Sequence, residues 1–359
     1  MRSTKNKKSL EDVTSTAELA KRLNLSRWTV SRVLNGHSGV HPKTVARIRA
    51  AMSEYGFAPN ALAQGLKTGR TNIIGVCLPE IEGLYLGQKL EFLREALTAK
   101  GYHVMVGMTN GDAQEELATV SRFRDLRAAG VILVASRVSQ TSVSIQSFLK
   151  SRTPLIQLDP MIEPPAGSIC VDRAKGMRQA TQHLLELGHR HIVPLGFSKD
   201  CRYSLQRLEG VIAAYKEKGL DSDKYVHPFY FPSDAGSFYE WGRDIAATIW
   251  KYSCGTQRNP ANPTAVLALN DRLAIGFIDG LRQLGVRVPE DFSVIGYDNM
   301  EIGAFIAPQL TSIDAQPDEL IREATERLLQ RIRGEAAADE NVVSIPARLL
   351  CRGSTGPRK

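Results

Sequence analysis

The sequence is short of the features that mark membrane, secreted and metal-dependent proteins. Its 359 residues contain no run of about 18 apolar residues, which argues against a membrane-spanning helix. The N-terminal segment is charged, but no apolar stretch follows it, so a secretion signal is not expected. The five cysteines are scattered without a C-x-x-C pair, so we expect reduced thiols and no zinc site. These absences favour a cytoplasmic protein that holds no metal.

Motifs of the common enzyme classes are missing as well. The chain has no G-x-x-x-x-G-K-[ST] phosphate loop, no strand-linked G-x-G-x-x-G, no G-x-S-x-G and no H-E-x-x-H. We therefore expect a protein that is not an enzyme, with no catalytic residues and no cofactor.

Positive charge is concentrated at the N-terminus. The net charge is +8, and residues 1–70 alone hold 13 Lys and Arg against 4 Asp and Glu, so the rest of the chain is close to neutral. This asymmetry is typical of a nucleic-acid-binding module attached to a neutral body. A solubilising basic extension is the alternative.

The N-terminal region has the pattern of a small helical module. Between residues 14 and 58, apolar residues recur at helical spacing in three short stretches. The hydroxyl of Ser26 can cap the second stretch, and the third begins near Pro42. We predict an all-α helix-turn-helix headpiece in 14–58, a disordered tail in 1–13 and a hinge helix or linker in 59–70.

From residue 71 onward, apolar strands alternate with helices. Ile73–Leu78 is a continuous apolar run, as expected for a strand buried on both faces. The alternation predicts an α/β body with parallel, doubly wound sheets, and about ten such units exceed one sheet. We therefore expect two lobes with a ligand cleft at the carboxyl ends of the strands. The predicted lobes of the domain 71–355 are 71–170 plus 300–328, and 171–299 plus 329–355.

Several motifs carry a resemblance to a known family. Residues 29–36 read T-V-S-R-V-L-N-G, residues 55–60 read Y-G-F-A-P-N, and 296–298 read G-Y-D. Over about residues 14–355 the chain resembles the LacI/GalR (lactose/galactose-repressor) family of bacterial transcriptional regulators. The resemblance implies a body like that of periplasmic binding proteins and a homodimer on a pseudo-palindromic double-stranded DNA operator. It also implies control by a small-molecule effector, most often a carbohydrate, and most often repression.

The start of the second helix is expected to contact DNA, because a recognition helix presents its first residues to base edges in the major groove. Arg27 can donate two hydrogen bonds to a guanine. Trp28 can press against a thymine methyl or the sugar-phosphate wall, or else belongs to the headpiece core. Arg32 reads a base or clamps a phosphate. The predicted contacts in this region are Ser26, Arg27, Trp28, Thr29, Ser31, Arg32 and Asn35.

The resemblance assigns a further DNA contact to the hinge. In the family, a leucine from each hinge helix of the dimer wedges into the minor groove at the centre of the operator. Leu66 is the matching residue, and Leu62 is the nearby alternative.

The resemblance also implies an effector site. Arg207 would hold hydroxyls or a carboxylate, Asn270 and Asp298 follow strands at the edge where α/β folds bind ligands, and Asp159 would accept hydroxyl protons. Tyr85 lies in a segment, G-L-Y-L, that departs from the N-P-F-F of many relatives, so the effector cannot be inferred from them. The alternatives are a helix cap or loop role for Asp159, Asn270 and Asp298, a surface salt bridge for Arg207, and simple packing for Tyr85.

A solute-binding protein of periplasmic type, without a transcriptional role, is the rival interpretation. Its two-lobed fold would match residues 71–355. The basic headpiece and the absence of a secretion signal argue against it.

Overall fold

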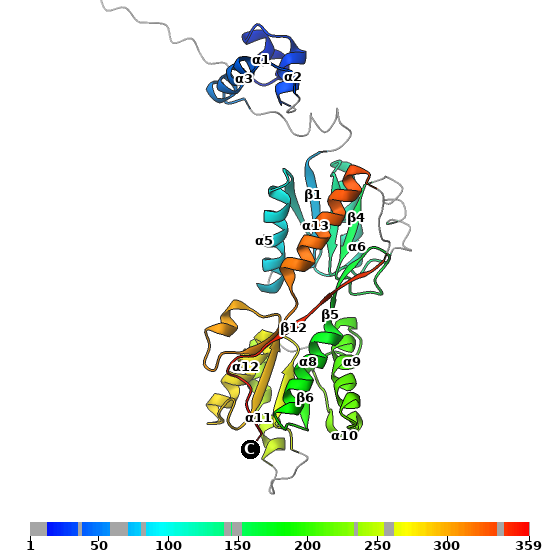
Figure 1. Cartoon of the computed structure of the whole chain (residues 1–359), viewed down its shortest axis with the longest axis vertical. Helices are drawn as coiled ribbons and strands as arrows, with labels where there is room; N and C mark the ends of the chain where they lie inside the picture. The colour runs from blue at the N-terminus through cyan, green and yellow to red at the C-terminus, as the bar shows by residue number, and fades with distance from the viewer. Residues whose placement is uncertain are drawn as a thin grey trace, which may run out of the picture. The chain divides into compact units, whose positions relative to one another are not determined.

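The chain forms two compact units, Met1–Asn72 and Ile73–Lys359 (Figure 1). The computed structural model describes residues 13–34, 38–57, 71–79, 84–139, 145, 153–232, 236–254, 262–335 and 341–358, and of residues 84 and 85 only the backbone. The predicted tail except Val13 and the predicted hinge 59–70 lie outside these residues.

The N-terminal unit contains three helices, α1 (Thr16–Arg22), α2 (Arg27–Leu34) and α3 (Pro42–Glu54). Serine side chains cap the N-termini of α1 and α2. The hydroxyl oxygen of Ser15 accepts a hydrogen bond from the backbone N–H of Glu18, and that of Ser26 accepts one from the N–H of Thr29 at 3.0 Å. The helices enclose a small apolar core made of Val13, Leu19, Ala20, Leu23, Val30, Ile48, Ala51 and Phe57.

The larger unit consists of two α/β lobes, each built on a six-stranded sheet. The first sheet has the order β11-β5-β4-β3-β1-β2, and the second β12-β10-β9-β8-β6-β7. All strand pairs are parallel except β10 with β12. The elements of the first lobe are β1 (Ile73–Leu78), α5 (Leu84–Thr98), β2 (His103–Met108), α6 (Ala113–Asp125), β3 (Gly130–Val134), β4 (Leu155–Leu158), β5 (Ile169–Asp172), α13 (Pro317–Arg333) and β11 (Val343–Pro346).

The second lobe has the same layered architecture. Its elements are α8 (Arg173–Glu186), β6 (Ile192–Phe197), α9 (Arg202–Glu217), α10 (Ser222–Tyr225), β7 (Phe229–Tyr230), α11 (Phe238–Ser253), β8 (Ala265–Ala268), α12 (Asp271–Gln283), β9 (Ser293–Tyr297), the 3-10 turn η1 (Glu301–Ala304), β10 (Thr311–Asp314) and β12 (Arg348–Leu350). Among the described helices, none combines the length and apolar character needed to cross a membrane.

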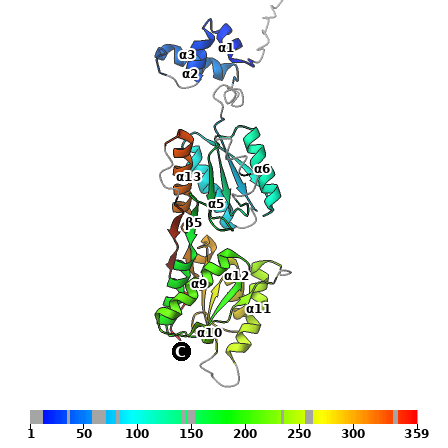
Figure 2. The same ribbon diagram turned by 90° about the vertical axis from the view of Figure 1, so that its right-hand side faces the viewer.

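Helices cover both faces of each sheet. In the first lobe, α5 and α13 lie on one face and α6 on the other, as Figure 2 shows. In the second lobe, α8 and α9 cover one face, and α11 and α12 the other. Because both faces are covered, the central strands are apolar throughout, which is why they read as continuous apolar runs in the sequence.

The lobes are joined by three crossings of the chain. The chain passes between lobes after β5, after β10 and after β11 (Figure 1). This connectivity leaves the carboxyl ends of the parallel strands of both lobes available to one shared cleft.

The predicted division of the lobes was wrong in its C-terminal part. Residues 311–314, which fall in the segment 300–328 predicted for the first lobe, form β10 of the second sheet. Strand β11 at 343–346, which falls in the segment 329–355 predicted for the second lobe, belongs to the first sheet. Strands β5 and β12 were not predicted. These strands are short, and β10 is half polar: Ser312 donates a hydrogen bond to buried Asp271, so its polar side chain is satisfied inside the protein.

Candidate functional site

The first residues of α2 form the exposed end of the headpiece that the sequence singled out. Arg27 is exposed, and within the described residues no hydrogen bond or ion pair engages it. Trp28 is 66% exposed, so the alternative that it belongs to the headpiece core is wrong. A large exposed aromatic beside a free guanidinium is a surface suited to a partner.

Other predicted contacts on α2 are held by the headpiece itself. Ser26 caps the helix and lies 2.8 Å from the hydroxyl of Thr29. The guanidinium of Arg32 stacks on the ring of Trp28, 4.8 Å from its centroid, and donates a hydrogen bond to the carbonyl of Ser38. Arg32 thus fixes the orientation of Trp28 while its own donors are partly used. Ser31 is half-buried.

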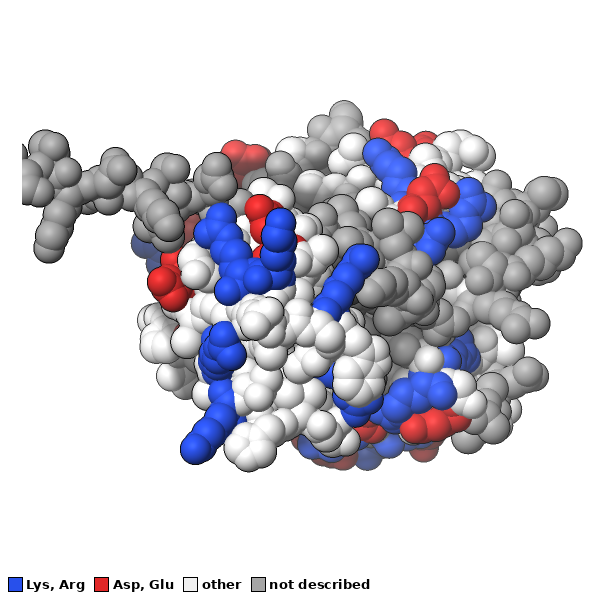
Figure 3. Space-filling model, turned by 90° about the horizontal axis from the view of Figure 1, so that it is seen from above, with Lys and Arg blue, Asp and Glu red and all other residues white. Residues whose placement is uncertain are grey.

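The surface charge of the headpiece is consistent with a polyanionic partner. Its described part contains seven basic residues and two acidic ones, Glu18 and Glu54. Figure 3 shows the Lys and Arg side chains of the molecule in the view from above. The predicted contacts Asn35, Leu62 and Leu66 lie outside the described residues.

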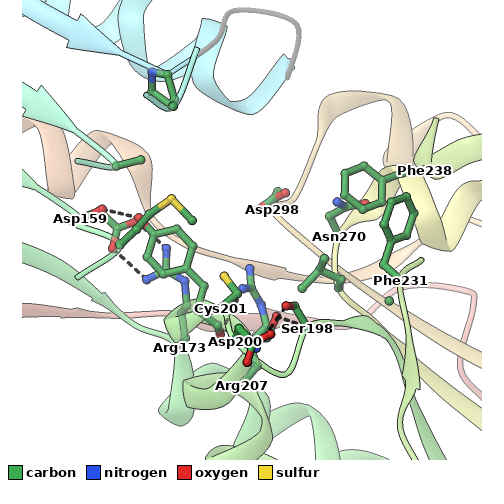
Figure 4. A pocket seen from close by; sticks show the side chains of 18 of the residues that line it. Asp159, Arg173, Ser198, Asp200, Cys201, Arg207, Phe231, Phe238, Asn270 and Asp298 are labelled. Carbon is green, nitrogen blue, oxygen red and sulfur yellow. Dashed lines mark hydrogen bonds and ion pairs between the residues drawn. The ribbon is translucent and has the colours of Figure 1, made fainter. Parts of the chain in front are cut away.

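A cleft of about 910 Å³ lies in the larger unit and is lined by residues of both lobes. Its size is that of sites for small organic ligands. Four of the five predicted effector residues line it: Asp159, Arg207, Asn270 and Asp298 (Figure 4). The backbone of Tyr85 lies in α5, and its side chain is outside the described part of the structure.

Two carboxylates follow strands at sharp turns of the backbone. Asp159 comes directly after β4 with a φ of 56°, and Asp298 directly after β9 with a φ of 101°. Positive φ is costly for residues other than glycine, and it is tolerated best by Asn and Asp. The two turns place both side chains at the cleft, one from each lobe.

Asp159 is fully engaged by protein groups. Its Oδ1 accepts from Arg173 at 2.8 Å and from the backbone N–H of Val171, and its Oδ2 pairs with Arg173 and with Lys89, whose Nζ is 3.6 Å away. A carboxylate has about four lone-pair sites, and these four donors fill them. Asp159 therefore has little capacity left for ligand hydroxyls, the role that the resemblance implied for it.

The pKa values in this group reflect the pairing. Burial alone would raise the pKa of Asp159, but Arg173 and Lys89 outweigh burial and hold it well below its usual range. Burial lowers the pKa of Lys89 in spite of the Asp159 carboxylate. The hydroxyl of Tyr203 donates to the backbone carbonyl of Asp159, and the Arg173 guanidinium stacks on the Tyr203 ring at 3.7 Å. We call Lys89, Asp159, Arg173 and Tyr203 the crossover cluster, because it joins β4 and α5 to α8 and α9.

Sequence reasoning missed three members of the crossover cluster: Lys89, Arg173 and Tyr203. Lys89 and Arg173 are only 2% and 4% exposed although they are charged. Nothing in the sequence distinguishes Lys89 from other charged positions on a helix. Arg173 follows the β5 strand that was also missed, so its place at the cleft could not be anticipated.

Arg207 differs from Arg173 in having no carboxylate partner. It is 6% exposed, it donates one long hydrogen bond to the carbonyl of Tyr203, and its guanidinium stacks on the ring of Tyr297 at 4.0 Å. Within the described residues its Nε has no hydrogen-bond partner, and no ion pair engages it. The alternative of a surface salt bridge for Arg207 is therefore wrong. Burial lowers its pKa.

Arg207 is held in place by close helix packing. Gly210, one turn further along α9, allows α9 to approach α8, because a Cβ there would lie only 2.1 Å from the carbonyl oxygen of Ala174. The same contact places the start of α8, with Arg173, beside the first two turns of α9.

Asn270 and Asp298 complete the polar wall of the second lobe. The amide oxygen of Asn270 caps α12 by accepting from the N–H of Leu273 at 2.9 Å, as the helix-cap alternative predicted. Within the described residues its amide nitrogen has no partner, so it remains a donor toward the cleft. Burial raises the pKa of Asp298 to about 6, although Arg207 and Lys89 oppose the rise.

A buried acid lies behind this wall. Asp271 is completely buried and accepts hydrogen bonds from the N–H of Met300 and the hydroxyl of Ser312, both at 2.6 Å. Burial raises its pKa to about 8, and the charge of Asp298 adds to the rise. Asp271 thus holds the β9–η1 loop, which carries Asp298. Asp271 itself does not line the cleft.

The far end of the cleft is aromatic. Phe231 lies 4.5 Å from Phe238 and 5.1 Å from Trp241, ring centre to ring centre, and Arg272 stacks on Phe238. Figure 4 shows Phe231 and Phe238 at the opposite end from Asp159 and Arg173, with Arg207 and Asp298 between. Among the described residues, no cluster of His, Cys, Asp and Glu could hold a metal ion.

Comparisons with known proteins agree with this architecture. Residues 16–60 match the family described as bacterial regulatory proteins, lacI family, and residues 181–355 match a periplasmic binding protein-like domain. The catabolite control protein A of Priestia megaterium is 26% identical over 342 residues, which cover 94% of this chain and 98% of the relative.

Two solved structures are similar over most of the chain. The lac repressor dimer bound to operator and the anti-inducer ONPF is 25% identical, with a TM-score of 0.79, and the match covers 96% of this chain and 100% of that one. A LacI family regulator from Enterococcus faecium with bound ribose is 27% identical, with a TM-score of 0.67, and covers 80% and 100%.

Proposed function

This chain belongs to the lacI family of bacterial regulatory proteins, and we propose that it acts in the cytoplasm as a homodimer that binds a pseudo-palindromic operator and represses transcription. The observation that carries the proposal is the combination of an exposed α2 N-terminus in a basic headpiece with a two-lobed domain whose cleft contains polar groups aimed at a ligand. Arg27 and Trp28 would contact bases, and Arg32 would position Trp28. Ser26, Thr29 and Ser31 would reach phosphates, and Leu66 or Leu62 would enter the minor groove.

The cleft suggests how operator affinity is controlled. The lobes are joined by three crossings of the chain, which allow their relative arrangement to change. A ligand that contacts both lobes favours one of these arrangements. Such a ligand shifts operator affinity by its differential binding to the two states, typically about 1–3 kcal/mol. The bound ribose of the similar E. faecium regulator supports a sugar or sugar derivative, held by Arg207, Asn270 and Asp298.

The surface of the first lobe supports a dimer. Strand β2 ends the first sheet in the described part of the chain, and Met105, Val106 and Met108 on it are 36%, 38% and 50% exposed. An edge strand with exposed apolar side chains is a template for a second chain. The similar lac repressor structure is a dimer. We assign β2 to the dimer interface.

Selection of genomic fragments by the purified full-length protein, at low and near-physiological salt, tests the DNA-binding part. Recovery of a pseudo-palindrome with half-sites about one helical turn apart is the expected result. Retention that is independent of sequence and disappears with salt would reflect backbone charge alone and contradict the proposal.

Sedimentation velocity tests the dimer. The variant with Met105→Lys and Met108→Lys should sediment as a monomer and lose operator binding. Ile212→Lys, which replaces a 41% exposed apolar residue on α9, is the matched control and should remain dimeric. A β2 variant that stays dimeric would remove β2 from the interface.

A further inference from the structure

The charges of the cleft identify the class of its ligand more closely than the comparisons do. We infer that the effector is an organic anion, a polyhydroxylated compound whose carboxylate or phosphate group binds Arg207. The inference rests on the proposed effector role of the cleft. It differs from the neutral ribose of the similar regulator.

The first argument is the excess of positive charge. Of the described cleft residues, the charged ones that are buried or half-buried are four basic and two acidic: Lys89, Arg173, Arg207 and Arg272 against Asp159 and Asp298. The exposed Arg137, Lys199 and Asp200 at the rim add a further positive charge. Burial raises the pKa of Asp271, the next acid behind the wall, and lowers that of Lys89, so the excess rests on the three arginines. An anionic ligand compensates buried positive charge, whereas a neutral sugar leaves it uncompensated.

The second argument is the state of Arg207. The carboxylate of Asp159 is the ion-pair partner of both Arg173 and Lys89, although the Nε of Arg173 also has no hydrogen-bond partner within the described residues. Arg207 is nine-tenths buried and, within the described residues, has neither an ion pair nor a partner for its Nε. A planar guanidinium binds carboxylates and phosphates through two parallel hydrogen bonds, a geometry that a single hydroxyl cannot match. Arg207 is therefore the anion-binding residue of the cleft.

The remaining groups fit the rest of such a ligand. The free amide nitrogen of Asn270 is a donor, and the carboxylate of Asp298 is an acceptor for hydroxyls. The aromatic end, with Phe231 and Phe238, offers an apolar face to the C–H side of a sugar chain or ring. Arg272, which stacks on Phe238, is a second cation within the same wall.

Binding to full-length protein at constant ionic strength tests the inference with three matched probe mixtures. The mixtures are pentoses and hexoses, the aldonates obtained by oxidising them, and their terminal phosphate esters. Ligands are detected by native mass spectrometry and ranked by isothermal titration calorimetry. At least one acid should bind about tenfold or more tightly than its neutral parent. The aldonate and phosphate arms distinguish the two possible anionic groups.

Variants connect the preference to Arg207. Arg207→Gln should reduce the anion affinity by about tenfold to a hundredfold and bring it close to that of the neutral parent. Lys216→Gln, an exposed cation on the same helix, is the control and should keep the preference. If Arg207→Gln does not fold, Arg272→Gln provides a second test, with a smaller loss in the same direction.

Each remaining outcome is decisive. Tighter binding of the neutral sugars, binding of none of the three mixtures, or an unchanged preference in both Arg variants overturns the inference. Operator selection on the same preparations separates it from the proposed function. A protein that selects an operator and responds to neutral sugars keeps its proposed function and loses the anionic effector.

Discussion

Two groups of buried charges face the same cleft, and they differ in what completes them. In the crossover cluster, Asp159 binds Arg173 and Lys89, and the three side chains are each at most 4% exposed. On the wall of the second lobe, Arg207 has no ion pair within the described residues, and Asp298 is half-buried with a raised pKa. Within the described residues, the charges of the first group are paired with one another, whereas Arg207 gains a counter-charge only when a ligand enters the cleft.

The difference separates residues that hold the lobes from residues that bind. A buried charge whose partners come from the fold contributes to the folded state, because removing one partner strands the other. A buried charge without a partner lowers stability until a ligand supplies the partner. Asp159 and Asp298 look equivalent in sequence, since each follows a strand, yet the structure gives them opposite situations.

The largest effect on stability is expected when the central carboxylate of the crossover cluster, that of Asp159, is removed. Asp159→Asn leaves Arg173 and Lys89 buried without their counter-charge, so the free energy of unfolding should fall by about 3–5 kcal/mol. Urea denaturation of the full chain measures the change. Asp223→Asn, at an exposed position, is the control and should stay within about 0.5 kcal/mol of the parent. Equal stability of the two variants would show that the pairing of Asp159 is not structural.

The sequence predicted which residues reach the cleft better than it predicted their partners. The resemblance assigned Asp159, Asn270 and Asp298 to the effector site, and their positions directly after strands agree with that assignment, because parallel strands end at one edge of a sheet. The engagement of Asp159 depends on Lys89, from another helix, and on Arg173, at a crossing between lobes. Such contacts join residues far apart in the chain, and no local periodicity records them.

The same reasoning applies to the strands and the headpiece. The long apolar strands were predicted, whereas β10 was not, because its Ser312 is buried through a hydrogen bond to Asp271 and leaves no apolar signal. On α2, Val30 already supplies the buried side, which favoured an exposed Trp28, while a core position remained the alternative. That choice depends on Arg32, which covers one face of the ring.

Two arginines of the headpiece differ in the same way: Arg32 contacts other residues of the headpiece, whereas Arg27 has no partner within the described residues. Arg27→Ala removes a side chain that has no partner within the described residues, and it should cost about 1–3 kcal/mol in discrimination at one base pair, with the fold unchanged. Arg32→Ala removes the stacking on Trp28 and the bond to Ser38, so it should lower affinity for all sequences. Electrophoretic mobility shifts with operators mutated at each position distinguish the two. A uniform loss in Arg27→Ala would assign it to phosphate contact.

The buried acid behind the cleft, Asp271, predicts how the free energy of unfolding depends on pH. The pKa of Asp271 is about 8 in the folded protein, whereas the pKa of an Asp in the unfolded chain is about 4. The folded state therefore binds more protons between these values, and stability should fall as pH rises from about 4 to about 8. The slope due to Asp271 is about 1 kcal/mol per pH unit, and Asp271→Asn should remove it. Urea midpoints at several pH values provide the measurement, and parallel profiles for the two proteins would contradict the assignment.

The smallest effect on stability, and the most informative about function, is expected at Arg207. Arg207→Gln removes a buried charge that has no ion pair within the described part of the chain. The loss of its stacking on Tyr297 offsets the gain, so the free energy of unfolding should change by less than about 1 kcal/mol. Arg173→Gln is the matched contrast, because it removes the main ion-pair partner of Asp159 and should cost about 3–5 kcal/mol. Both are tested by denaturation without ligand. If the two arginines proved equally costly, Arg207 would have a structural partner after all, and the division between residues that hold the lobes and residues that bind would fail at its central position.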